Sequence, residues 1–561
     1  MAKIVKKSFP WFLVVSLVFG LIFSFSGLRF NLRFSEVKAD DASTSVEVGN
    51  VAPSFTVAPH EDPASWGGGD SGGSGPTNAG DDVTFKATAT DANGDQWKLL
   101  VCKTAGVSGV DCDGGASDRW CVSASAVNSG SENSCAYTTS DSDAQSNDWY
   151  AYACDAQSCS SVNQGSGNSG SPFKVNHRPS FTAASNNGPK DPGQDVTWTT
   201  TVSDSDDDTY QDQVKLYVCA TSGFNPSSGC TGTQLCASNW TTSNPSCSYS
   251  IPTPTPDTTY NAYVYVIDWH SFAASGGQQG ANSSYAVNNV APSVSNVTLN
   301  NGNNIDLIES STKDVTVTAT VSDNNSCQDI QTVKTSVYRS GIGWSGCDTE
   351  GEANENYCYA LITCTYDTGT CTGSNDVDAT YTCTVSIWHD ADPTDSGTQY
   401  PDQNWLNTVI GYDEALSGYT EISTGVEMNS LVALDVTNAI NYGTLAPGGE
   451  NDTDKTAAVT ATGNVGLDAE YSGTNMTSGG NSIPVSQQKY DLTGGKTWSN
   501  MDYTLSGTAT ERELNCQKTT NHTNPATKNT YFRIRIPDNQ PTGTYSGTNT
   551  FGAVKGETGD W

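Results

Sequence analysis

Strict alternation of apolar or small residues with threonine marks three stretches of the chain. They lie at residues 82–91, 195–204 and 314–323, and each ends at an aspartate that begins a polar turn. A two-residue period places every second side chain on one face of a strand, so each stretch predicts a β-strand with one buried face. A second apolar run follows each turn, at residues 97–101, 214–218 and 333–337.

The order of strand, acidic turn and strand returns about every 115 residues, which indicates tandem copies of one all-β domain. We expect the copies to span residues 47–176, 177–288 and 289–429. Each copy opens at a proline followed by serine and an apolar residue, at Pro53, Pro179 and Pro292. Proline has no backbone N–H to donate, so each opening predicts an edge strand.

The closing segment, residues 430–561, does not repeat this order. It alternates apolar residues and breaks them with Gly, Pro and Asn, as in 440–448, 463–468 and 543–551. This pattern predicts a β-sandwich of a different kind.

The N-terminus indicates the compartment. Lys3, Lys6 and Lys7 precede an apolar run over 9–28, and small residues stand before Asp40. Residues 1–39 are therefore expected to be a signal peptide, or a retained signal anchor, since about 20 apolar residues suffice to span a bilayer. In both cases the rest of the chain is expected outside the cell.

Composition narrows the function classes. The net charge is −35, with 61 acidic against 26 basic residues, so no basic stripe exists to neutralise the phosphates of a nucleic acid. The 13 tryptophans and 24 tyrosines, together with the regular alternation, argue against a disordered chain.

The 17 cysteines fall as six, four and six in the three copies, plus Cys516. Even counts predict internal disulfides and an oxidising compartment. The candidates are Cys102, Cys112, Cys121, Cys135, Cys154, Cys159, Cys219, Cys230, Cys236, Cys247, Cys327, Cys347, Cys358, Cys364, Cys371 and Cys383.

Comparison of the copies suggests how these cysteines pair. Four cysteines allow three connectivities, and we expect nearest neighbours to bond in the first two copies: Cys102–Cys112 and Cys121–Cys135, with their equivalents. Cys154 and Cys159 are absent together from the second copy, which suggests that they bond to each other. The third copy has Tyr338 in place of Cys102 and must be linked differently. For Cys516 an intermolecular bridge and a free thiol are both open.

The acidic turns are the sharpest candidate site. Oxygen ligands stand at alternate positions in two of them, as Ca²⁺ requires: Asp91, Asn93 and Asp95, and Asp204, Asp206 and Asp208. An EF-hand is excluded, because Cys102 stands where its last glutamate would be. Calcium would therefore need further ligands, for instance Asp155 or Asp268. The alternative is a solvated turn, and the third copy offers a weaker set, Asp323 to Asn325.

Catalytic motifs are missing from the sequence. It contains no nucleophile elbow, phosphate-binding loop or dinucleotide-binding loop, and its five histidines lack zinc-ligand spacing. We therefore expect no enzyme and no cofactor other than calcium. Loop tryptophans are candidates for contact with a glycan or protein, although core packing is the alternative for each: Trp66, Trp240, Trp269 and Trp344.

Residues 47–429 resemble the immunoglobulin-like or fibronectin-III-like modules of bacterial and archaeal surface proteins, in which proline-opened sandwiches follow one another. The closing segment resembles the β-sandwich that often ends such proteins. The resemblance implies a structural or adhesive stalk at the cell surface, or alternatively an array of carbohydrate- or protein-binding modules. Partners would be other surface proteins or glycans, with the membrane touched through the N-terminal segment if it is not cleaved.

Overall fold

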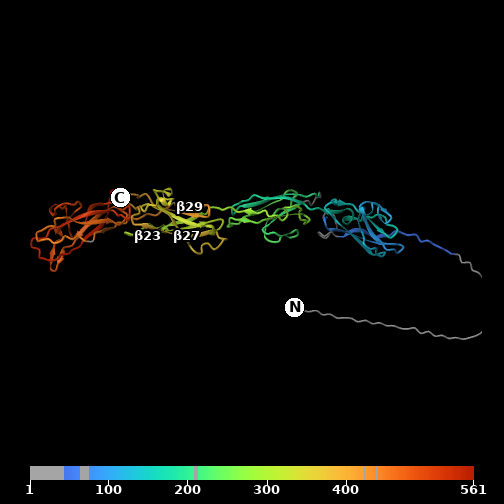
Figure 1. Cartoon of the computed structure of the whole chain (residues 1–561), viewed down its shortest axis with the longest axis horizontal. Helices are drawn as coiled ribbons and strands as arrows, with labels where there is room; N and C mark the ends of the chain where they lie inside the picture. The colour runs from blue at the N-terminus through green and yellow to red at the C-terminus, as the bar shows by residue number, and fades with distance from the viewer. Residues whose placement is uncertain (1–42, 63–74, 207–212, 423, 438) are drawn as a thin grey trace, which may run out of the picture. The chain divides into compact units, whose positions relative to one another are not determined.

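The computed structural model describes residues 43–62, 75–206, 213–422, 424–437 and 439–561. The expected signal segment (1–39), Trp66 and Asp208 lie outside these residues. The described chain is built from strands and short 3₁₀ turns, without an α-helix (Figure 1). None of its helices is long and apolar enough to cross a membrane.

In domain 1 (residues 47–176), six main strands form two antiparallel sheets. The first sheet has the order β1 (Ser54–Asp62), β3 (Asp82–Thr90), β8 (Glu132–Thr138), and the second has the order β10 (Tyr150–Cys154), β4 (Lys98–Cys102), β7 (Arg119–Val122). Short strands complete the domain: β2 (Thr77–Asn78), β5 (Val107–Ser108), β6 (Asp111–Cys112), β9 (Ser146–Asn147) and β11 (Phe173–Asn176).

Domain 2 (residues 177–288) repeats this connectivity. One sheet is β12 (Ser180–Asn186), β13 (Asp195–Ser203), β18 (Ser246–Ser250), and the other is β17 (Gln234–Ala237), β14 (Val214–Cys219), β20 (Tyr263–Asp268). The short strands are β15 (Phe224–Asn225), β16 (Gly229–Cys230), β19 (Thr259–Tyr260) and β21 (Tyr285–Ala286).

Domain 3 (residues 289–429) has the same order with one strand added to each sheet. One sheet is β22 (Ser293–Leu299), β23 (Thr312–Ser322), β27 (Asp378–Trp388), β26 (Thr365–Tyr366), and the other is β25 (Cys358–Thr363), β24 (Thr332–Arg339), β28 (Trp405–Tyr412), β29 (Ser417–Glu421). β23 and β27 pair along their whole lengths and are labelled in Figure 1.

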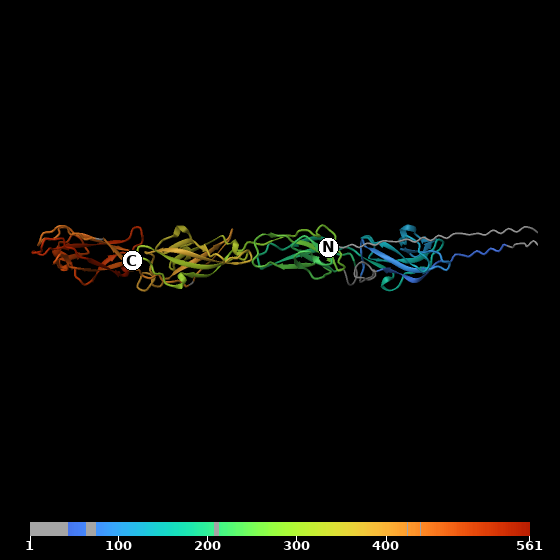
Figure 2. The same ribbon diagram turned by 90° about the horizontal axis from the view of Figure 1, so that it is seen from below.

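The strand pairs confirm the predicted fold class, which is all-β with tandem immunoglobulin-like sandwiches. The three predicted alternating strands are β3, β13 and β23, and their apolar side chains are buried at every second position, as with Val83, Phe85, Ala87 and Ala89. The proline-opened strands β1, β12 and β22 lie at sheet edges, as predicted. In Figure 2 the sheets of the three domains are seen from a second direction.

The closing segment (430–561) forms a sandwich of different connectivity. A five-stranded sheet has the order β30 (Leu434–Val436), β31 (Lys455–Ala461), β38 (Thr527–Ile534), β35 (Gln488–Asp491), β36 (Tyr503–Thr504). The second sheet has the order β37 (Thr510–Cys516), β32 (Leu467–Gly473), β39 (Asn549–Lys555), and a hairpin of β33 (Met476–Ser478) and β34 (Asn481–Ile483) projects from it.

Each of the four ranges contains its own cluster of buried apolar side chains. In the three repeated domains these clusters include fully buried tryptophans: Trp97 and Trp149, Trp198, and Trp405. The closing segment uses Tyr471, Tyr490 and Phe532 instead. Large buried aromatic groups contribute most of the apolar area that holds such small sandwiches together.

Eight disulfides lie within the described residues, all of them inside one of the three repeated domains. They are Cys102–Cys112, Cys121–Cys135, Cys154–Cys159, Cys219–Cys230, Cys236–Cys247, Cys327–Cys371, Cys347–Cys358 and Cys364–Cys383. Domains 1 and 2 thus pair nearest neighbours, and domain 3 adds a long-range bridge. Cys516 is a buried thiol, and burial raises its pKa.

Candidate functional site

The acidic turns of the three repeated domains share one local geometry. In each, a carboxylate at the end of the alternating strand accepts a hydrogen bond from the backbone N–H two residues further on. The pairs are Asn93 N to Asp91 Oδ1 (2.7 Å), Asp206 N to Asp204 Oδ1 (3.2 Å) and Asn325 N to Asp323 Oδ1 (2.7 Å). In this turn the hydrogen bond holds one carboxylate oxygen in place, and the other oxygen remains available to groups next to the loop.

In domain 1 the turn meets a second acidic turn. Asp91, Asp95 and Asp155 each present a carboxylate oxygen, and the three oxygens lie within 4.8 Å of one another. Asp91 and Asp155 are buried, and Oδ2 of Asp91 has no hydrogen-bond partner among the described residues. Asn93 is not part of this cluster: its backbone supports the turn, and its side chain is exposed.

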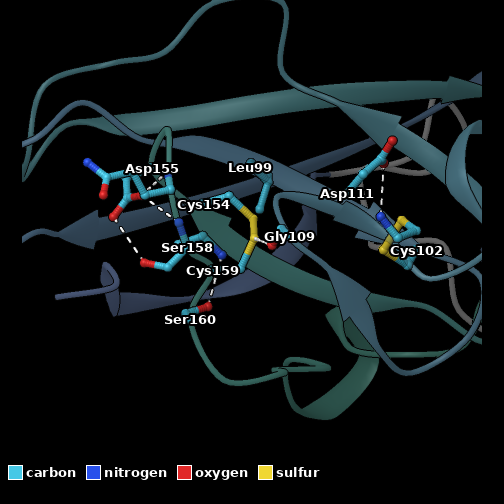
Figure 3. The surroundings of a disulfide bond; sticks show 12 residues. Leu99, Cys102, Gly109, Asp111, Cys154, Asp155, Ser158, Cys159 and Ser160 are labelled. Atoms are coloured by element: carbon cyan, nitrogen blue, oxygen red, sulfur yellow. Dashed lines mark hydrogen bonds between the residues drawn. A yellow bond between two sulfur atoms is a disulfide. The ribbon is translucent and has the colours of Figure 1, made fainter. Parts of the chain in front are cut away.

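A disulfide encloses the turn that carries Asp155. The bonded pair Cys154 and Cys159 stands on either side of it, and Oδ1 of Asp155 accepts from the backbone N–H groups of Gln157 (2.6 Å) and Ser158 (2.7 Å) (Figure 3). The carboxylate is therefore held by both a covalent bridge and hydrogen bonds, close to the Asp91 turn.

Domain 2 arranges its acidic turn differently. Both oxygens of Asp206 are engaged by His177, through Nδ1 to Oδ1 (2.6 Å) and the backbone N–H to Oδ2 (2.6 Å). Asp268 accepts from Asn176 Nδ2 (2.8 Å). Protein donors from the 176–177 linker thus occupy Asp206 and Asp268, two of the carboxylates that were candidates for calcium. The structure favours a protein-satisfied turn here, with Asp204 and Asp206 outside any three-acid cluster among the described residues.

The charges of domain 2 reflect this packing. Burial lowers the pKa of His177, but the hydrogen bond and negative charge of Asp206 outweigh it, so the pKa is raised overall. Burial raises the pKa of Asp268 to about 7, against the opposing effect of the Asn176 hydrogen bond. Both groups therefore hold protons more tightly in the folded chain than in the unfolded one.

Domain 3 contains a three-acid cluster that the sequence pattern did not reveal. Asp323, Asp329 and Asp413 present carboxylate oxygens within 4.8 Å of one another. Asp329 ends the 3₁₀ turn η4 (Cys327–Asp329), which the Cys327–Cys371 disulfide ties down, and Asp413 follows β28. Burial raises the pKa of Asp323 to about 6, against the opposing effect of the Asn325 hydrogen bond and with a smaller contribution from the charges of Asp329 and Asp413.

The tryptophan loops form two aromatic surfaces. Trp240 and Trp269 meet edge to face with ring centroids 5.1 Å apart, and Trp269 is 40% exposed. Trp344 lies 6.2 Å from the ring of Tyr419, which is 62% exposed. An exposed aromatic face suits stacking on a sugar ring or a partner's side chain.

A second polar cluster joins domain 3 to the closing segment. The ring of His522 stacks on Trp388 at 3.7 Å, and its Nδ1 lies 2.5 Å from Oε2 of Glu355. Lys518, which is buried, donates to the backbone oxygen of Asp390 (2.7 Å) and pairs with Asp392 (3.2 Å). Cationic and acidic side chains of the two segments thus meet at this contact.

Comparisons with known proteins provide no functional assignment. No model of a known protein family matches the chain, and no curated protein matches it. Among solved structures it is similar to the ectodomain of mouse nectin-like molecule 4 (8% identity, 62% of this chain and 95% of that one, TM-score 0.25). It is also similar to the Escherichia coli adhesin FdeC (12% identity, 69% and 99%, TM-score 0.20) and to a marsupial T cell receptor (10% identity, 62% and 97%, TM-score 0.24). The strand pairing, rather than these similarities, defines the fold as tandem immunoglobulin-like sandwiches.

Proposed function

We propose that this chain is an exported, non-catalytic protein of the cell surface that serves as a structural or adhesive stalk of several domains. The observation that carries the proposal is a disulfide joining the two sheets in each of the first two domains, Cys121–Cys135 and Cys236–Cys247. In domain 3, Cys364–Cys383 links β27 to the residue between β25 and β26. Such bridges persist in oxidising compartments, which supports export.

The bridges also support a mechanical role. Cys121 belongs to β7 and Cys135 to β8, which lie in different sheets, so the bond keeps the two layers from separating. Cys236 on β17 and Cys247 on β18 do the same in domain 2. Under mechanical force a β-sandwich unfolds when its sheets separate, and a covalent bond between the sheets opposes that separation.

A second candidate function is recognition of a carbohydrate or protein. The Trp240–Trp269 pair favours it, because an exposed, pre-arranged aromatic face costs little conformational entropy on binding. Partners would then be glycans or other surface proteins. Loss of glycan-array binding in Trp269→Ala, with binding kept in Trp405→Phe as a core control, would favour recognition over a purely structural role.

We also propose that the domain 1 turn binds calcium through Asp91, Asp95 and Asp155. The grouping of three carboxylate oxygens and the unpartnered Oδ2 of Asp91 support it, while Asn93 contributes its backbone to the turn. Slower hydrogen exchange of residues 91–97 in CaCl₂ than in EDTA is the expected result. Asp155→Asn should lose this response. Exchange of the wild type that does not change with calcium would contradict the proposal.

The experiment that tests the main proposal is surface labelling of intact cells that produce the full chain. A membrane-impermeant amine reagent should label the protein, and sequencing of its N-terminus should give Asp40 if the signal is cleaved or Met1 if it anchors the chain. An unlabelled protein in the soluble cell interior would refute export.

A further inference from the structure

Three acidic side chains in domain 3 have buried oxygen atoms without a hydrogen-bond partner. Asp323 is 0% exposed and Asp413 is 6% exposed. Oδ2 of Asp323, of Asp329 and of Asp413 all lack a partner among the described residues. Buried carboxylate oxygens are almost always hydrogen-bonded or paired with a cation, so three together call for a ligand.

In two of the turns, backbone N–H groups already donate to Oδ1 of the aspartate and hold its carboxylate in place. Asn325 N donates to Oδ1 of Asp323 (2.7 Å), and the N–H groups of Ala415 (2.8 Å) and Leu416 (2.6 Å) donate to Oδ1 of Asp413. The turns are thus held by their own backbones. One carboxylate oxygen of each of these two residues and one of Asp329 lie within 4.8 Å of one another.

No basic side chain in the described part of the chain forms an ion pair with these three carboxylates. None of the ion pairs among the described residues includes Asp323, Asp329 or Asp413. The other groups that act on Asp329 are acidic too, namely Asp257 and Glu414. In domain 2, by contrast, Asn176 donates to Asp268, the counterpart of Asp413.

We infer that Asp323, Asp329 and Asp413 bind one Ca²⁺ ion. Ca²⁺ takes oxygen ligands at about 2.3–2.6 Å, so ligands on opposite sides of it stand about 4.6–5.2 Å apart. The 4.8 Å within which the three oxygens lie fits a single ion among them. The cluster offers only oxygen, and the nearby Cys327 is bonded to Cys371, which disfavours zinc. This site goes beyond the proposed function and does not depend on it.

The ion would order a loop that contacts the preceding segment. Asn325, in the Asp323 turn, donates through Nδ2 to the backbone oxygens of Thr255 (3.1 Å) and Asn288 (2.9 Å) and accepts from Val290 N (2.8 Å). Calcium at Asp323 therefore stabilises the turn on which these three hydrogen bonds depend. In an exported protein, calcium would set how firmly residues 255–290 hold domain 3.

The test is hydrogen exchange of the full chain, read in peptides that cover 323–331 and 409–416, in 10 mM CaCl₂, 10 mM MgCl₂ or EDTA. Extracellular calcium sites have a Kd of about 10⁻⁴–10⁻³ M, so 10 mM Ca²⁺ should raise protection by about 10- to 100-fold. Asp413→Asn keeps the side-chain oxygen that accepts hydrogen bonds in its turn and removes one ligand charge. Asp329→Asn removes a ligand charge from the other loop. Both should abolish the response.

Asp314→Asn is the matched control. Asp314 is an exposed aspartate on the same strand, β23, at the end away from Asp323, where it accepts from Ser386 Oγ (2.6 Å). This variant should keep the wild-type calcium response. Calcium-independent exchange in the wild type, an equal response to magnesium, or a response that survives both Asp413→Asn and Asp329→Asn would each overturn the inference.

Discussion

Removal of the longest bridge, Cys327–Cys371, should destabilise its domain more than removal of the shortest, Cys154–Cys159. The closed loops span 44 and 5 residues. In the chain-entropy relation, closing a loop of n residues contributes about 2.1 + 1.5R ln n in cal/mol/K, which gives about 4 kcal/mol for the long loop and about 2 kcal/mol for the short one at 25 °C. The difference of about 2 kcal/mol corresponds to about 30-fold in the opening constant.

The two bridges are well matched for this comparison. Each joins one buried cysteine, Cys327 or Cys154, to one half-buried cysteine, so the cavities left by alanine should be alike. The variants are Cys327→Ala with Cys371→Ala, and Cys154→Ala with Cys159→Ala. Exchange of β28 in domain 3 and of β3 in domain 1, each compared with the wild type in EDTA, measures the loss. Equal losses, or a larger loss in domain 1, would refute the loop-entropy reasoning.

Three further predictions concern pH, a buried charge and glycans. Domain 2 should be more stable at pH 5 than at pH 8, because the pKa values of His177 and Asp268 are raised and the folded state therefore binds protons more tightly than the unfolded state. This stability is lost as pH rises through about 7. Hydrogen exchange of domain 2 at the two pH values measures the direction of the change in stability. Lys518→Met leaves Asp392 buried without one of its partners and should cost about 3 kcal/mol in the contact between domain 3 and the closing segment. The exposed Lys528→Met should be close to neutral in the same denaturant titration. In a host that attaches N-glycans, Asn451 should stay unmodified, because it is buried and its Oδ1 accepts from Ile534 N, which intact-mass and peptide mapping would show. The other asparagines in Asn-X-Ser/Thr motifs are exposed and are the candidates for glycan attachment: Asn239, Asn282, Asn296, Asn324, Asn475 and Asn521.

The fold could be predicted because its signal is local. A two-residue period needs only neighbouring positions, and β3, β13 and β23 follow it with buried residues at alternate sites. The pairing of Cys102 with Cys112 coincides with the nearest-neighbour expectation, since Cys102 ends β4 and Cys112 ends β6, with only the short β5 between them. The bridge between Cys327 and Cys371 depends on the return of a distant segment, which no local pattern contains.

The candidate sites show where local patterns fail. The turns of domains 1 and 2 look alike in sequence, yet His177 enters only the second, at the position where Val51 and Val290 precede their prolines. That histidine is the one signal in the sequence that could have separated the two turns. Asp329 carried no such signal, because it stands in an irregular turn and reaches Asp323 through the path of the chain.

The central claim, an exported protein whose repeated domains are held by disulfides, is tested most directly by counting thiols on protein taken from the cell surface. Denatured without reductant, each chain should react with one equivalent of an alkylating reagent, at Cys516, and with 17 equivalents after reduction. Recovery of the protein from the cell interior with most of its thiols reactive before reduction would contradict the account.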